Sequence, residues 1–165
     1  MENTSTRDFE RLAVAEREGL VRFAWGMLSD AHEAEDMAQE ALTRLLPVYG
    51  RAENPRAYLY KTITNLCLQR LQRRARSAPV SSQPQDDGED PALRQESREA
   101  VRRALDSLTE NERAAVLLRE VEHLSYAKIA ETLNATVSQV TNWISRGKSE
   151  LRRKLLPYIE KGEMP

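Results

Sequence analysis

The amino-acid sequence predicts an all-α protein made of two small helical domains. Its 165 residues are rich in Ala, Leu, Glu and Arg and include only six glycines, a composition that favours helices. Apolar residues recur at helical spacing, and no segment shows the sustained alternation of a half-buried strand. The segment SAPVSSQPQDDGEDP, which is rich in proline and acid, separates two blocks of this pattern. We therefore expect domains at residues 1–76 and 92–165, joined by a flexible acidic linker at residues 77–91.

The first block opens with an amphipathic segment and a well-capped helix. An apolar stripe that includes Val14, Leu20 and Phe23 indicates one or two amphipathic helices before residue 29. Asp30 is placed to cap the next helix, with Glu33 at the reciprocal position of a capping box. The apolar stripe of that helix consists of Ala34, Ala38, Ala41, Leu42 and Leu45. Its end is marked by a proline at position 47 and a glycine at position 50.

A further helix is predicted from the dipeptide Asn54-Pro55, which supplies an N-cap and then a proline at the first helical position. We expect this helix to run to about Arg76. Its inner side is formed by Leu59, Ile63, Leu66 and Arg70. The single cysteine, Cys67, lies near that side, so we expect a buried structural thiol.

The second block is predicted to contain three or four helices. One runs from about residue 91 to residue 107, and a capping box of Thr109 and Glu112 opens the next. That helix packs Ala115, Val116, Leu118 and Val121 into the core. Ser125 caps a short helix, and a turn around residues 134–136 leads into a long final helix.

The segment SYAKIAETLNATVSQVTNWISRGKSELRRKL has the spacing of a helix-turn-helix. At about 100° per residue, the inner face of its second helix consists of Val140, Ile144, Gly147 and Leu151. The opposite face consists of Ser138, Asn142, Ser145, Arg146 and Ser149, which are residue types that contact base edges in a major groove. A solvated helical hairpin is the alternative. Asn134 stands where a turn glycine is frequent, and asparagine tolerates the left-handed conformation that the turn needs.

Charge is distributed unevenly along the chain although its sum is only −1. Residues 1–76 carry a net charge of +1, residues 77–96 carry −4 and residues 97–165 carry +2. Two basic runs, Arg70 to Arg76 and Arg146 to Lys154, can neutralise phosphates locally. The charge pattern therefore allows DNA binding without requiring it.

Several classes of chemistry lack the residues that they need. The two histidines, His32 and His123, are far apart and have no metal-ligand spacing. No glycine-rich phosphate loop and no nucleophile motif is present, so we expect no enzyme, no cofactor and no metal. No apolar stretch approaches the length of a membrane span and no signal-peptide core is present, which predicts a cytoplasmic protein.

Three segments in this order resemble the extracytoplasmic-function (ECF) sigma factors of bacterial RNA polymerase. LVRFAWGMLSDAHEAEDMAQEALTRLL and NPRAYLYKTITNLCLQRLQRR are similar to the promoter-melting domain of that family. LTENERAAVLLREVEHLSYAKIAETLNATVSQVTNWISRGKSELRRKLL is similar to its promoter-recognition domain. The resemblance implies binding to core polymerase, at the clamp of the largest subunit and the flap of the second-largest. It also implies recognition of minus-thirty-five and minus-ten promoter DNA, DNA melting, and control by an anti-sigma factor.

The resemblance assigns residues to three interfaces. The polymerase clamp would be contacted by Asp36, Gln39 and Glu40. Minus-ten DNA would be contacted by Tyr58, Lys61, Asn65, Gln69, Arg70 and Arg73. Minus-thirty-five DNA would be contacted by Ser138, Gln139, Asn142, Trp143, Arg146 and Lys148. Tyr58 and Tyr60 stand at aromatic positions of the family, where packing is favoured over base stacking. Trp143 either packs on the DNA backbone or completes the core.

The chain departs from the family pattern at four of these or neighbouring positions. Gln69 and Gln72 replace the usual Asp and Arg, and Thr141 and Trp143 stand where Lys and Arg are frequent. No promoter sequence is therefore transferred from the family. Two other functions stay open from the residues alone, namely a stand-alone helix-turn-helix regulator and a helical adaptor that binds only proteins. The acidic linker is either a spacer or a mimic of nucleic acid that growing RNA displaces.

Overall fold

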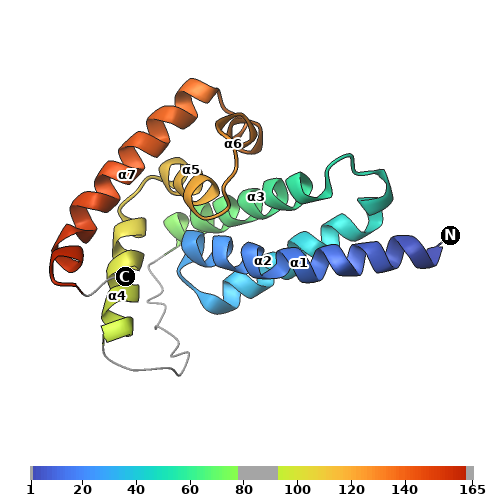
Figure 1. Ribbon diagram of the computed structural model, residues 1–165, viewed down its shortest axis with the longest axis horizontal. Helices are drawn as coiled ribbons and strands as arrows, with labels where there is room; N and C mark the ends of the chain where they lie inside the picture. The colour runs from blue at the N-terminus through green and yellow to red at the C-terminus, as the bar shows by residue number, and fades with distance from the viewer. Residues whose placement is uncertain (1, 78–92, 163–165) are drawn as a thin grey trace. The chain divides into compact units, whose positions relative to one another are not determined.

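The structure is a computed structural model that describes residues 2–77 and 93–162, with side chains described for residues 4–77 and 95–162. The chain divides into two compact units, Met1–Ser82 and Gln83–Pro165. Every regular element of the described residues is helical, which confirms the all-α fold (Figure 1). Apart from Ser77, the predicted linker lies outside the described residues, as does the start of the helix expected from residue 91.

The first unit is built from three helices that contact one another pairwise (Figure 1). They are α1 (Glu2–Leu28), α2 (Ala31–Leu45) and α3 (Pro55–Arg76), with the 3-10 helix η1 (Leu46–Arg51) between α2 and α3. The amphipathic segment before residue 29 is thus one helix. Its inner face includes Leu20 and Phe23, and the Phe23 ring meets the Tyr60 ring edge to face at 6.3 Å. Val14 was expected in the same stripe, but 81% of its surface is exposed because only the second half of α1 carries the core.

Both predicted caps of the first unit form. The Asp30 carboxylate accepts a hydrogen bond from the backbone N–H of Glu33 at 2.9 Å, and the Asn54 side chain accepts one from the N–H of Ala57 at 3.0 Å. The expectation that Glu33 returns a bond to Asp30 is wrong. Its carboxylate instead pairs with arginines of α3, because two guanidinium groups attract a carboxylate more strongly than one neutral N–H does.

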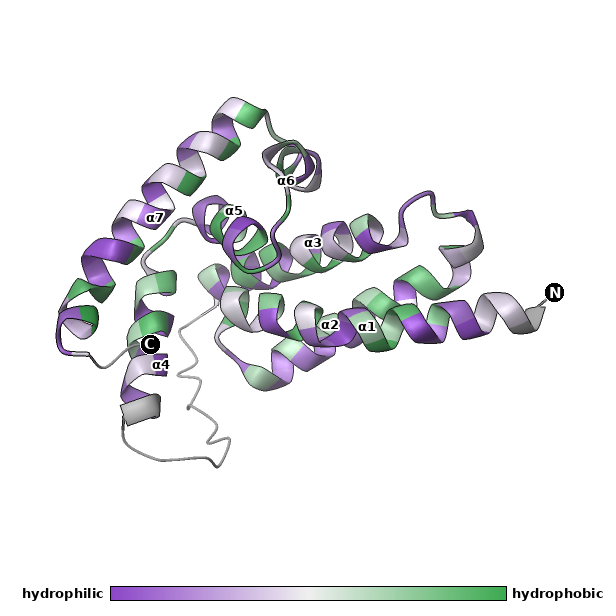
Figure 2. Cartoon of the chain, in the orientation of Figure 1, coloured by the Kyte–Doolittle hydropathy of each residue, from purple (hydrophilic) through white to green (hydrophobic). Residues whose placement is uncertain are grey.

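The second unit packs three helices against one long helix (Figure 1). The elements are α4 (Leu93–Asp106), α5 (Glu110–Glu120), α6 (Tyr126–Leu133) and α7 (Val137–Glu160), and α7 contacts each of the others. The predicted capping box forms at α5, where Thr109 and Glu112 exchange hydrogen bonds of 3.2 and 3.3 Å. Ser125 caps α6 by accepting from the N–H of Lys128. Figure 2 shows hydrophobic and hydrophilic residues alternating around α7, as expected for a helix with one face in the core.

The α6–turn–α7 segment has the predicted helix-turn-helix arrangement. Asn134 has φ 51° and ψ 51°, which confirms the left-handed turn that its residue type suggested. Val140 and Ile144 are buried on the inner face of α7. Gly147 is buried on the same face and lies against α5 so closely that an added Cβ would stand 2.5 Å from Cγ2 of Val116. The lack of a side chain at position 147 therefore sets how near the two helices approach.

Candidate nucleic-acid interface

The outer face of α7 presents the side chains that the sequence predicted for base contacts. Ser138, Asn142 and Arg146 are all exposed on the first three turns of the helix. Trp143 is half-buried at the flank of this face, so it contributes to packing and keeps part of its ring accessible. An exposed amide and an exposed guanidinium one turn apart can bond adenine and guanine edges, respectively.

Gln139 has a second task that restricts how it can contact a base. Its side-chain oxygen accepts from the backbone N–H of Thr136 at 2.9 Å, while the Thr136 hydroxyl accepts from the N–H of Gln139 at 3.1 Å. This capping box opens α7 and went unnoticed, although the spacing Thr-x-x-Gln is its sequence signature. The Thr136 hydroxyl also donates to the Gln139 oxygen at 3.3 Å, so both lone pairs of that oxygen are engaged. Reading adenine with an amide requires both its oxygen and its nitrogen, so Gln139 retains only donor capacity toward DNA while the capping box holds.

The basic side chains of α7 differ in whether they form ion pairs with acidic residues of the same chain. Lys148 pairs with Glu120 of α5 at 3.2 Å. Arg153 donates two hydrogen bonds to Glu150, and these bonds lower the pKa of that carboxyl and raise the pKa of the guanidinium. Arg146 and Arg152 are exposed. Lys148 therefore has to exchange a carboxylate for a phosphate if it contacts DNA.

A second polar stripe runs along α3. Lys61, Asn65, Gln69 and Arg73 follow one another at intervals of four residues and are all exposed. Tyr58 lies near the start of the stripe with 36% of its surface exposed, and its hydroxyl donates to the backbone oxygen of Arg44. The structure thus brings five of the six predicted minus-ten residues to one face. Tyr60 is 1% exposed, which confirms that it packs in the core.

Arg70 is separated from that stripe. It is half-buried and its guanidinium lies 3.6 Å from the carboxylate of Glu33 on α2. Arg74, which the sequence placed only in a basic run suited to phosphates, pairs with the same carboxylate and also donates to the backbone oxygen of Leu28 at 2.7 Å. These contacts tie the end of α3 to α1 and α2 in one place, a long-range arrangement that local sequence signals do not reveal. Cys67 is buried on the inner side of α3, as expected.

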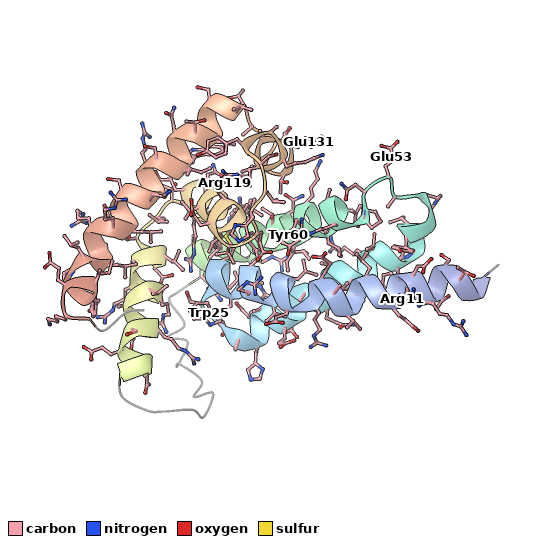
Figure 3. All side chains as sticks on the ribbon, viewed as in Figure 1. Arg11, Trp25, Glu53, Tyr60, Arg119 and Glu131 are labelled. Atoms are coloured by element: carbon pink, nitrogen blue, oxygen red, sulfur yellow. The ribbon has the colours of Figure 1, made fainter. Side chains whose placement is uncertain are left out.

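The acidic face of α2 is accessible. Asp36 and Gln39 are exposed, and Glu40 is half-buried and pairs with Arg44 one turn later at 2.8 Å. Figure 3 shows side chains projecting from α2 and from the neighbouring α1, where Arg11 and Trp25 are labelled. A face with two exposed acceptor-bearing side chains and a paired carboxylate suits a basic protein partner.

Two kinds of feature are absent from the part of the chain that the structure describes, namely a membrane span and a metal-binding cluster. Among residues 2–77 and 93–162, no helix is both long and apolar enough to serve as a membrane span. Over the same residues, no group of three or more His, Cys, Asp or Glu side chains has the placement needed to hold a metal ion.

Comparison with known protein families assigns the α3 stripe and the outer face of α7 to two regions of one kind of protein. The family model for sigma-70 region 2 matches residues 12–77, and the model for sigma-70 region 4 matches residues 98–151. Together the two matches span more than half of the chain, and each falls on one compact unit. Together with the ECF sigma factors among its relatives, these matches show that the chain belongs to the ECF sigma factors. In this family assignment, α3 with its polar stripe lies in region 2, and the helix-turn-helix lies in region 4.

The chain is similar in sequence to sigma factors of several bacteria. This ECF sigma factor is 32% identical over 151 residues to the ECF RNA polymerase sigma factor SigE of Mycolicibacterium smegmatis, which covers 83% of this chain. It spans only 57% of the length of that relative. It is 27% identical to the ECF RNA polymerase sigma factor SigW of Bacillus subtilis, with 84% of each protein covered. It is also 29% identical to the RNA polymerase sigma-H factor of Pseudomonas aeruginosa, covering 93% of this chain and 89% of that protein.

Two solved structures share the fold. The sigma factor RpoE of Bartonella quintana, crystallised with the anti-sigma factor NepR, matches with a TM-score of 0.70 at 21% identity, covering 90% of this chain and 97% of that one. CnrH, solved in complex with the cytosolic domain of CnrY, matches with a TM-score of 0.69 at 19% identity, covering 91% and 88%. At these identities the likeness establishes the fold of the two helical units.

Proposed function

We propose that this ECF sigma factor binds core RNA polymerase, recognises the minus-thirty-five and minus-ten elements of a promoter, and helps melt the DNA to start transcription. The observation that carries the proposal is the pairing of two sigma-70 regions, in order, with two exposed polar helix faces. Each face belongs to a separate compact unit. The protein would act as an initiation factor without catalysis of its own, in the cytoplasm where the polymerase works.

The proposed polymerase contact is the α2 face, formed by Asp36, Gln39 and Glu40. The exposed side chains of this face carry hydrogen-bond acceptors and are not surrounded by a large apolar surface. Such a face suits a contact that orients a basic partner, because charge complementarity affects association rate and specificity more than affinity. The family resemblance points to the clamp of the largest subunit as this partner, and to the flap of the second-largest subunit as the partner of the second unit.

The proposed minus-ten contact is the α3 stripe of Lys61, Asn65, Gln69 and Arg73, with Tyr58 at its edge. Cations along the stripe would follow the backbone of one displaced strand, and the two amides would bond base edges that unpairing exposes. Arg70 joins this contact only if a phosphate displaces Glu33 from its side. The proposed minus-thirty-five contact is the outer face of α7, with Asn142 and Arg146 reading base edges and Ser138, Gln139, Trp143 and Lys148 supporting them.

We also propose control by an anti-sigma factor. Two proteins of the same fold were solved in complexes, one with an anti-sigma factor and one with the cytosolic domain of a partner protein. A protein that covers either the α2 face or the α7 face would remove one of the surfaces that initiation needs.

Run-off transcription with purified core polymerase tests the proposal. The chain should make the core enzyme start at one class of promoter, selected from random DNA by the reconstituted holoenzyme. The double variant Asp36→Ala/Gln39→Ala should weaken association with the core, whereas Glu53→Gln, an exposed acid between η1 and α3, should not. Binding to a palindrome without polymerase would indicate a stand-alone regulator, and association with neither DNA nor polymerase would indicate an adaptor. Either result would overturn the proposal.

A further inference from the structure

An exposed apolar side chain stands at the start of α7, beside the polar residues of the proposed DNA-reading face. Val137 is the first residue of the helix, and 49% of its surface is exposed. A single exposed valine is ordinary on a protein surface. Val137 is nevertheless placed where it can contact DNA, because the first turn of the second helix of a helix-turn-helix is the part that reaches base edges.

Thr141 extends this apolar surface by one turn. It is exposed, and its hydroxyl donates to the backbone oxygen of Val137 at 2.8 Å. Residues at i and i+4 are neighbours on a helix, so the two side chains lie next to each other. Because the hydroxyl of Thr141 donates its hydrogen to the backbone, it can only accept from a ligand, and its γ-methyl is the group left for apolar contact. Two side chains thus form a small surface of methyl groups, which we call the methyl edge.

The rest of the face has a different chemistry. Asn142 and Arg146 are exposed and polar, and lie on the other side of Ser138 from the methyl edge at about 100° per residue. The capping box with Thr136 fixes the backbone at the first turn and engages the oxygen of Gln139. The start of α7 therefore offers hydrogen bonds along one side and apolar contact along the other.

We propose that the methyl edge of Val137 and Thr141 reads the 5-methyl group of a thymine in the minus-thirty-five element. In the major groove, thymine is distinguished by this methyl group, and apolar side chains are the groups that contact it. The inference rests on the proposed function, since it requires the outer face of α7 to lie in a major groove. It adds a preference that the polar residues cannot supply, because hydrogen bonds do not detect a methyl group.

Deoxyuridine provides an atomic test, since it differs from thymidine only by lacking that methyl. Holoenzyme reconstituted with the full chain first selects its promoter from random DNA. Each thymine of the selected upstream element is then replaced singly by deoxyuridine, and affinity is measured by competition at fixed salt. We expect one position to lose about threefold to fourfold in affinity, the effect of removing one buried methyl group. Val137→Ala and Thr141→Ser, which keeps the hydroxyl, should each reduce the preference for thymine at that position.

Leu156→Ala is the matched control, because Leu156 is 44% exposed near the far end of the same helix. This variant should keep the full preference for thymine. The inference is overturned if no selected element contains a thymine that deoxyuridine weakens, or if both variants keep the preference. It is also overturned if Val137→Ala weakens association with core polymerase in the absence of DNA, which would assign the side chain to a protein contact. Failure of the proposed function looks different, since no holoenzyme with start-site choice would form at all.

Discussion

The close approach of α5 and α7 makes Gly147 the most sensitive position of the second unit to a minimal change. In Gly147→Ala the new Cβ would stand 2.5 Å from Cγ2 of Val116, whereas carbon atoms in contact prefer about 3.5–4.0 Å. Val116 is 4% exposed and β-branched, so its methyl cannot turn aside easily. To remove this steric clash, the two helices must separate by about 1 Å over the contact.

Two opposing terms set the size of the effect. Alanine is favoured over glycine in a helix interior by about 0.5–1 kcal/mol, and overpacking a tight core costs about 1–3 kcal/mol. The cost is at the upper part of its range here, because the neighbour is a stiff buried methyl group. We expect Gly147→Ala to lower the free energy of unfolding of the second unit by about 1–2 kcal/mol, a change of roughly tenfold in its unfolding equilibrium.

The chain has two tryptophans, one in each unit, which permits a direct assay. In a Trp25→Phe background, the fluorescence of Trp143 reports urea unfolding of the second unit alone. Ser149→Ala is the matched control, since Ser149 is exposed on the same helix and surface changes of this kind stay within about 0.5 kcal/mol.

A double-mutant cycle separates the clash from other effects of the substitution. Val116→Ala alone should cost about 2 kcal/mol through lost burial, but it also removes the methyl that Gly147→Ala strikes. The double variant should therefore be more stable than the sum of the two single changes predicts, by about 1 kcal/mol or more. Additive effects, or a Gly147→Ala protein as stable as the Ser149→Ala control, would refute the packing argument.

Substitutions at five other positions test separate features of the fold. Asn134→Ala should destabilise the second unit by about 1 kcal/mol while Asn134→Gly should be neutral, because φ is +51° and only alanine is penalised there; equal stabilities in the Trp143 assay would contradict this. Asp106→Asn should cost about 1–2 kcal/mol, because it weakens a 2.8 Å bond to Arg113, whose side chain is 6% exposed. Glu150→Gln should cause no measurable change at neutral pH, because its pair with Arg153 is exposed and screened by solvent, and a loss as large as that of Asp106→Asn would count against the burial argument. Arg153 lowers the pKa of Glu150, so the pair persists until the pH becomes acidic. Glu33→Gln should lower the stability of the first unit by about 1–3 kcal/mol, measured by Trp25 fluorescence in a Trp143→Phe background, because it weakens the partner of Arg70 and Arg74. Glu35→Gln, which breaks an exposed pair with Arg17, should stay within about 1 kcal/mol of the parent, and equal losses for the two variants would argue against the tie at Glu33.

Local sequence signals were enough to predict where most of the helices begin and the turn between α6 and α7. Asn54-Pro55, Thr109 with Glu112, and Ser125 each begin a helix where expected, because capping joins a side chain to a backbone group only three residues away. The left-handed turn at Asn134 follows from the same local chemistry. The exposed stripe of α3 was equally predictable, since helical periodicity alone separates an inner face from an outer one. The same periodicity placed Arg70 on the inner side, and only the family resemblance grouped it with the DNA contacts.

Which charged side chains form ion pairs with other helices became known only from the three-dimensional structure. Glu33 was expected in a cap, yet it pairs with arginines about 40 residues later in the chain, and Lys148 was expected on DNA, yet it pairs with Glu120 of a neighbouring helix. The tight contact of Gly147 with Val116 likewise joins residues from two helices. Such pairings depend on how helix faces pack against one another. That packing is stabilised by contacts throughout the core, so no local sequence signal predicts the pairings.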